Sequence, residues 1–360
     1  MLFLTTFLGN TQENTPTISL LTFDTGLESY SLFGHTALRV QNPKTRQDIV
    51  YNFGMFDFDT PNFLLKFIKG ELQYKVGIEK CKPMLRAYQS VNRQVSEQIL
   101  HFTPEQTLQI IQKLETAYRP ENRYYRYGFL SRNCSTEIRD IIFKNTPGLA
   151  YTPTETGFSY RHYLKNYSQP MPWLKFGINL ALGSNIDKKI NTHELMFLPD
   201  YLATEVEKAK VNNETLAGLG KKLLKNIEKP QPSPWMITPF LVFSFLFVLM
   251  VLGKSETLKK AFVLAVGIGG LIILTINLIS GHPEVHDNYN LLWMNPLYLV
   301  LFGLNFASAE KIKKVLHFVL LACLVATLGV WILKIQGHVN AFFPIVISLF
   351  WIHLKQLQKA

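Results

Sequence analysis

Residues 235–253 read WMITPFLVFSFLFVLMVLG, a run of 19 residues without a charged side chain. A helix needs roughly 20 apolar residues to cross the hydrocarbon core of a bilayer, so this run predicts a membrane span. Four further apolar runs follow at residues 261–279, 291–309, 315–333 and 339–354. Asn295 and Pro296 make the run at 291–309 the weakest of the five. Together the runs predict an α-helical membrane domain of about five spans over residues 235–360.

Lysines in the short connections between these runs predict the orientation. The connections on one side of a five-span arrangement, together with the C-terminal tail, carry eight lysines, and those on the other side carry one. Because Lys and Arg are enriched in cytoplasmic loops, the tail is expected inside the cell and residues 1–234 outside it.

The residues before this membrane half have the charge balance of a water-soluble domain. They hold all ten arginines and 22 of the 26 acidic residues, which excludes a single soluble domain for the whole chain. The formal net charge is +11, but the lysines are dispersed rather than gathered on one motif, so no nucleic-acid partner is predicted. We divide this half into a possible signal remnant (1–16), an exported domain (17–206) and a basic linker (207–234).

The linker contains an amphipathic pattern. Leucines and an isoleucine recur at three- and four-residue spacing over residues 214–227, with three lysines between them. This pattern predicts a basic amphipathic helix, which would either lie on anionic lipid or pack against the soluble domain. The proline-rich residues 229–234 predict an extended connector into the first span.

The exported domain begins with strands and continues with helices, which predicts an α+β fold. Short alternating or β-branched runs predict strands at residues 18–22, 36–40 and 48–53. Apolar stripes predict helices at 104–118, with Thr103 as the N-cap, and at 134–144.

A thiol and an imidazole are the candidate catalytic groups. Cys134 follows Asn133 and opens the helix predicted at 134–144, where backbone N–H groups and the helix dipole stabilise a thiolate. A thiolate nucleophile needs a base, and His35 follows a glycine at the start of a predicted strand. Asn52, on the next strand, is the candidate that orients the imidazole in a Cys-His-Asn arrangement.

Other interpretations of these residues remain open. Cys134 can instead pair with Cys81 as a disulfide in an oxidising compartment, and His35 can be a structural residue of its strand. Cys323 lies within the fourth apolar run and is interpreted as an apolar filler.

Several motifs resemble one family, in the same order along the chain. SLFGH (31–35), YNFGMFDF (51–58), RYYRY (123–127), NCSTEIRD (133–140) and MFLPD (196–200) look like the exported domain of Lnb-type lipoprotein N-acyltransferases of Bacteroidetes. The resemblance covers most of residues 17–205, and residues 282–296 resemble the membrane half of that family. More distantly, the order of His35, a polar residue and Asn133-Cys134 is similar to permuted NlpC/P60-type enzymes. This similarity implies a permuted papain-like fold, although a second histidine often replaces Asn52 in those relatives.

The resemblance implies a multi-pass enzyme of the bacterial inner membrane with its catalytic domain in the periplasm. It would take an acyl chain from a phospholipid onto Cys134 as a thioester. The chain would then pass to the N-terminal amine of the lipidated cysteine of a lipoprotein. Cys134, His35 and Asn52 would be catalytic, and no cofactor or metal is implied.

Six further residues are candidates for substrate binding or for holding the oxyanion. Ser31, Asn133 and Arg139 lie near the candidate catalytic residues in sequence, although an ion pair between Arg139 and Asp140 explains that arginine equally well. His282, His286 and Trp293 lie in a polar loop that we expect to act as a lid or acceptor site, or to form an aromatic belt at the membrane interface. His282 and His286 lack a third fixed ligand, so no metal site is predicted there.

Two other functions use the same features. A membrane-anchored cysteine hydrolase of the cell envelope, acting as a peptidase, amidase or lipid esterase, would employ the same Cys134 and His35. A non-enzymatic receptor would hold Cys134 in a disulfide with Cys81.

Overall fold

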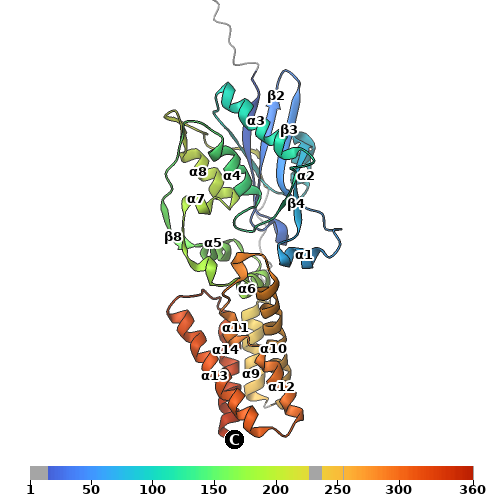
Figure 1. Ribbon diagram of the computed structural model, residues 1–360, viewed down its shortest axis with the longest axis vertical. Helices are drawn as coiled ribbons and strands as arrows, with labels where there is room; N and C mark the ends of the chain where they lie inside the picture. Colours follow the sequence, from blue (N-terminus) through green and yellow to red (C-terminus); the bar gives the residue numbers. More distant parts are fainter. Residues whose placement is uncertain (1–14, 227–236, 254, 360) are drawn as a thin grey trace, which may run out of the picture. The chain divides into compact units, whose positions relative to one another are not determined.

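The computed structural model describes residues 15–226, 237–253 and 255–359, which form two compact units (Figure 1). The first unit, here the α/β unit, contains the described residues up to Phe63, then Leu72–Glu155, and then residues 191–226. The second, the helical unit, contains Leu64–Glu71, Thr156–Ile190 and the C-terminal residues. The sequence placed all of residues 17–206 in one domain, whereas the structure groups 156–190 with the C-terminal helices. The signal remnant, apart from its last two residues, and the connector at 229–234 lie outside the described residues.

An antiparallel sheet of seven strands organises the α/β unit. Its order is β12-β5-β1-β2-β3-β4-β6, and every neighbouring pair is antiparallel. The strands are β1 (Thr17–Phe23), β2 (His35–Asn42), β3 (Gln47–Met55), β4 (Gln73–Lys80), β5 (Val95–Ile99), β6 (Tyr124–Arg126) and β12 (Lys221–Leu224). The three predicted strands are confirmed as β1, β2 and β3, and the α+β class is confirmed with them.

Helices cover both faces of this sheet because its strands bury side chains on both sides. Leu20 belongs to the core beneath α3 (Pro104–Tyr118), α4 (Cys134–Lys144) and α8 (Pro199–Lys208), whereas Leu21 belongs to the core beneath α2 (Cys81–Ser90). Both predicted helices are confirmed at their predicted bounds. Thr103 caps α3 by accepting a hydrogen bond from the backbone N–H of Gln106.

The predicted amphipathic helix at 214–227 is wrong over the described part of that segment. The chain forms β11 (Glu214–Thr215) and then β12, which pairs with the edge strand β5 through Lys221 opposite Glu97. Leu216 is buried and Leu219 is 88% exposed, so the leucines do not share one face. Gly218 and Gly220 weaken a helix here, and the unpaired N–H and C=O groups of β5 provide backbone partners that a helix cannot use.

The helical unit contains two helices that are long and apolar enough to cross a membrane, α10 (Glu256–Ile279) and α13 (Glu310–Ile332). A shorter apolar helix, α9 (Pro239–Leu252), precedes them, and α14 (Phe342–Lys359) follows. The third predicted span is divided into α11 (Asn290–Trp293) and α12 (Leu297–Gly303). The division falls at Pro296, which has no N–H, and the Asn295 side chain accepts the N–H of Leu297. Five spans therefore stay a prediction, and the structure gives two clear ones.

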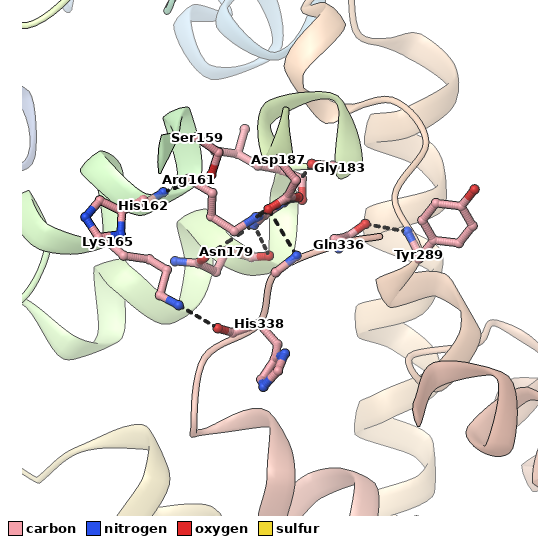
Figure 2. A network of polar contacts seen from close by, with 12 residues as sticks. Ser159, Arg161, His162, Lys165, Asn179, Gly183, Asp187, Tyr289, Gln336 and His338 are labelled. Carbon is pink, nitrogen blue, oxygen red and sulfur yellow. Dashed lines mark hydrogen bonds and ion pairs between the residues drawn. The ribbon is translucent and has the colours of Figure 1, made fainter. Parts of the chain in front are cut away.

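Residues 156–190 are tied to the C-terminal part of the helical unit by hydrogen bonds to the loop before α14, including one from Lys165 to the His338 carbonyl. Figure 2 shows Arg161 of α5 (Tyr160–Tyr167) beside Asp187 within this segment. The Arg161 Nε lies 2.9 Å from the Asp187 Oδ1. The same guanidinium donates to the carbonyls of Leu182 and Gly183, and Asp187 accepts from the N–H of Gly337. The loop before α14 is thereby tied to the segment after α5.

Candidate active site

Cys134 is the first residue of α4, and Asn133 is its N-cap. The Asn133 side-chain oxygen accepts the N–H groups of Ser135 and Thr136 at 2.9 and 3.0 Å. Its NH₂ group donates to the carbonyls of Phe129 and Phe197. These four bonds use the hydrogen-bonding capacity of the buried amide. Asn133, predicted to contact substrate or oxyanion, therefore fixes the start of the helix that carries the thiol.

His35 begins β2 directly after Gly34, as the sequence predicted. Gly34 has a φ of +76°, a left-handed conformation that favours glycine and turns the chain into the strand. Nε2 of His35 lies 3.1 Å from Oδ1 of Asn52, and the imidazole lies close enough to the Cys134 thiol for each group to shift the pKa of the other. The structure thus brings together the three residues that the sequence assigned to catalysis.

Glu79 extends this arrangement and was not predicted. The Asn52 side-chain NH₂ group donates to Oε1 of Glu79, which lies on the neighbouring strand β4. Burial raises the pKa of Glu79, although its hydrogen bond from Asn52 and the charge of His35 oppose that rise. The hydrogen bonds from His35 to Asn52 and from Asn52 to Glu79 hold the imidazole in one orientation beside Cys134. A short alternating run at residues 73–80 is the only local signal for β4, and nothing local predicts that it pairs with β3.

The thiol and the imidazole shift each other's pKa in opposite directions. Burial alone would raise the pKa of Cys134, but the charge of the nearby His35 and the polar groups around the thiol, among them the Thr36 backbone, lower it below its ordinary value. Burial alone would lower the pKa of His35, but the charge of Cys134 and hydrogen bonds to Cys134 and Asn52 raise it. Both shifts favour a thiolate beside an imidazolium, which is the state of a thiol nucleophile with its general acid.

We expect Cys134 to react with iodoacetamide at a pH well below that of an ordinary thiol. The thiolate is the reactive form, so a lowered pKa moves the midpoint of alkylation rate against pH to lower pH. Mass spectrometry of the tryptic peptides measures this rate for each cysteine. Cys81 is the internal control, because burial raises its pKa to about 11 and its side chain is 1% exposed. In His35→Ala the midpoint for Cys134 should rise, and an unchanged midpoint would contradict the ion pair.

A second group near the thiol is Tyr125, on β6. A Cβ built on Gly54 would lie 3.5 Å from Cys134 Cβ, 3.8 Å from Cys134 N and 3.9 Å from Tyr125 Oη. The Tyr125 side chain is buried, and the structure gives its hydroxyl no acceptor among the described residues. Gly54 therefore leaves a small space that the Cys134 backbone nitrogen and the Tyr125 hydroxyl both face. Tyr127, two residues further on, instead stacks on Tyr74, with ring centroids 4.2 Å apart.

Ser31 and Arg139, two predicted binding residues of this unit, have partners within it. The buried Ser31 hydroxyl donates to the Glu28 carbonyl at 3.0 Å. Arg139 pairs with Asp140 at 2.8 Å and donates to the His193 carbonyl, which is the ion-pair alternative that the sequence left open. Contact of either residue with substrate stays a prediction.

The three predicted binding residues of the loop at 282–296 lie in the helical unit. His282 Nε2 is 2.8 Å from the Phe67 carbonyl, at the end of α1 (Phe63–Lys69). The His286 backbone packs against Gly183, where a Cβ would overlap its carbonyl oxygen. Trp293 is fully buried beside Phe342 and donates to Asn290. Trp293 is thus a core residue of the helical unit, and a fully buried indole has no surface to offer a substrate.

The alternative disulfide between Cys81 and Cys134 is absent from the structure, in which both are free thiols. Cys81 packs in the core beneath α2 with Leu21 and Val50, whereas Cys134 packs against the core beneath α4. The sheet separates these two cores, so a bridge would require backbone movement.

Comparisons with known proteins cover both units. Residues 4–166 match the family described as the Lnb N-terminal periplasmic domain, and residues 231–357 match the Lnb transmembrane domain. No curated protein and no solved structure matches the chain. A periplasmic-type domain followed by a transmembrane domain, together with the apolar helices α10 and α13, indicates a membrane protein. Both halves match the same family in the same order, and that family suggests a membrane-associated enzyme of lipoprotein processing. The chain therefore belongs to the Lnb-type family.

Proposed function

We propose that this chain is a lipoprotein N-acyltransferase that works through a thioester on Cys134. The observation that carries the proposal is the Cys134–His35 pair at the start of α4, in a chain whose C-terminal part matches the Lnb transmembrane domain. The donor is a phospholipid and the acceptor is the N-terminal amine of the lipidated cysteine of a lipoprotein. The catalytic unit acts in the periplasm, at the outer face of a bacterial inner membrane that the chain crosses several times.

The first half-reaction transfers the acyl group to the enzyme. The Cys134 thiolate attacks an ester carbonyl of the phospholipid, and a carbon–sulfur bond forms. The resulting oxyanion occupies the space beside Gly54 and accepts hydrogen bonds from the Cys134 N–H and the Tyr125 hydroxyl. The carbon–oxygen ester bond then breaks, and His35 gives its proton to the departing lysophospholipid oxygen.

The second half-reaction delivers the acyl group to the lipoprotein. Neutral His35 takes a proton from the acceptor amine as the amine nitrogen attacks the thioester carbonyl. The amide forms, and Cys134 leaves as a thiolate. Asn52 and Glu79 keep the same imidazole nitrogen directed at the reacting atoms in both halves. A thioester suits this step because it is reactive toward amines, and competing hydrolysis is suppressed when water is excluded.

Mass spectrometry of lipoprotein N-termini tests the proposal. The intact chain is expressed in a bacterial host that lacks its own lipoprotein N-acyltransferase, beside Cys134→Ser and the control Cys323→Ala. Wild type and the control should add an N-acyl chain to the lipidated cysteine, and Cys134→Ser should not. Equal acylation by Cys134→Ser would reject this nucleophile. Absence of acylation by wild type, with ester or peptide cleavage that depends on Cys134, would establish the cysteine hydrolase instead.

A further inference from the structure

Four large apolar side chains that lie close to the catalytic residues in sequence are exposed on the α/β unit, and we call them the ridge: Leu27, Tyr30, Met55 and Phe58. These side chains are 46, 62, 41 and 63% exposed. The ring centroids of Tyr30 and Phe58 are 6.2 Å apart, and Phe58 contacts Phe56 at 4.7 Å. Large side chains that gather on a surface, rather than being scattered singly, mark a site that an apolar ligand covers.

The ridge continues directly from the catalytic residues in the chain. Tyr30 precedes His35 by five residues, and Met55 follows Gly54, which contacts Cys134. Met55 is held in place because its sulfur occupies the space above Gly77 of β4. Phe58 is four residues beyond Gly54, so their Cα atoms are at most about 14 Å apart. This is a length that an extended fatty acyl chain spans when its carbonyl is at Cys134.

Aromatic contacts connect the ridge to buried side chains of the α/β unit. Phe56 packs on the buried Tyr74 at 5.2 Å, and Tyr74 stacks on Tyr127. The exposed rings therefore rest on the core of the α/β unit. A ligand that covers Tyr30 and Phe58 meets a preformed surface and pays little ordering entropy.

Charge around the ridge favours a hydrocarbon chain over a bilayer surface as its occupant. Glu28, Asp57 and Asp59 are interleaved with the apolar residues. A face that lies on anionic lipid carries Lys and Arg among its apolar side chains, and these carboxylates would be repelled by anionic head groups. A neutral acyl chain is not repelled by these carboxylates. The protein also carries a transmembrane domain, which brings it to a lipid bilayer.

We propose that the ridge of Leu27, Tyr30, Met55 and Phe58 binds the acyl chain that is being transferred, while its carbonyl carbon reacts with Cys134. The inference rests on the proposed thioester and adds a determinant of chain length. In the test reaction the thiolate attacks a p-nitrophenyl ester, the thioester forms, and p-nitrophenolate leaves with the bonding electrons.

The ridge is tested with the full-length protein in phosphatidylcholine vesicles. The protein is acylated either by p-nitrophenyl acetate or by p-nitrophenyl octanoate. Release of p-nitrophenolate gives the rate, and the mass of the Cys134 peptide gives the adduct. Tyr30→Ser/Phe58→Ser should lower the octanoate rate about tenfold, as if about two methylene groups of the chain stayed in water, and leave the acetate rate within about twofold. Val91→Ser/Leu108→Ser is the matched control, because these side chains of the same unit are 60 and 54% exposed and are not part of the ridge.

The outcomes separate the ridge from the thioester. If the ridge variant keeps the wild-type ratio of octanoate to acetate rates, the ridge does not bind the chain. If both rates fall together, the substitutions damage the catalytic residues, and the assignment of chain binding is rejected. If wild type forms no adduct on Cys134 with either ester, the thioester itself is rejected, and the inference falls with it.

Discussion

Cys134→Ala and His35→Ala are each expected to lower the rate of acyl transfer by about 10³-fold or more, and the double variant by no more than the worse single one. The reason is that the two groups act as one unit, a thiolate and an imidazolium that shift each other's pKa. Once either group is lost, the other has no remaining role in the reaction. The measurement is the amount of N-acylated lipoprotein formed per unit time by purified protein in vesicles.

His101→Ala is the matched control for this pair of variants. His101 lies in the same unit, is exposed, and bonds the Thr215 carbonyl through Nδ1. It should retain the wild-type rate, and all variants should unfold at similar temperatures. If the losses of the two single variants multiply in the double variant, then Cys134 and His35 work independently and the proposed mechanism is wrong.

Asp187→Ala is expected to lower the free energy of unfolding of the helical unit by about 3–5 kcal/mol. The Arg161 side chain is 3% exposed and Asp187 is 12% exposed, so the variant leaves a guanidinium charge buried without its carboxylate. Gly337 also loses the acceptor of its N–H. Denaturant titration of the protein in mild detergent measures the change, and faster proteolysis within residues 156–190 should accompany it.

Glu310→Ala provides the comparison within the same unit. Glu310 pairs with Lys313 at 2.7 Å but is 82% exposed, so its loss should cost about 0.5 kcal/mol or less. If the two variants are equally stable, Arg161 has found other partners of the same strength, and the segment at 156–190 is held by packing alone.

Elements encoded by neighbouring residues could be predicted from the sequence. The alternation in β1 to β3 and the stripes of α3 and α4 record which faces are buried, and Thr103 and Asn133 are residues that cap helices wherever they occur. Those signals were enough to set Cys134 at a helix start and His35 at a strand start. Asn52 followed because β2 and β3 are consecutive strands, which usually pair.

Features that depend on distant partners could not be predicted. Leucines and lysines at 214–227 have a helical period, yet the segment up to Leu224 forms short strands, because the edge of β5 supplies hydrogen bonds for β12. The composition of residues 156–190 is that of a water-soluble segment, yet Asp187 accepts the N–H of Gly337, and the segment belongs to the helical unit. In both cases the deciding partner is far away in the chain.

By itself the sequence determined that this protein has a soluble α+β half and a membrane half, and that a cysteine at a helix start can meet a histidine at a strand start. Periodicity, capping and hydropathy are local properties, so contiguous residues carry them. Only the tertiary structure decided that Glu79 hydrogen-bonds Asn52, that Gly54 leaves a space next to Cys134 and Tyr125, and that Tyr30 packs near Phe58. Each of these depends on which strands and loops become neighbours, and that choice is made by the packing of the whole unit.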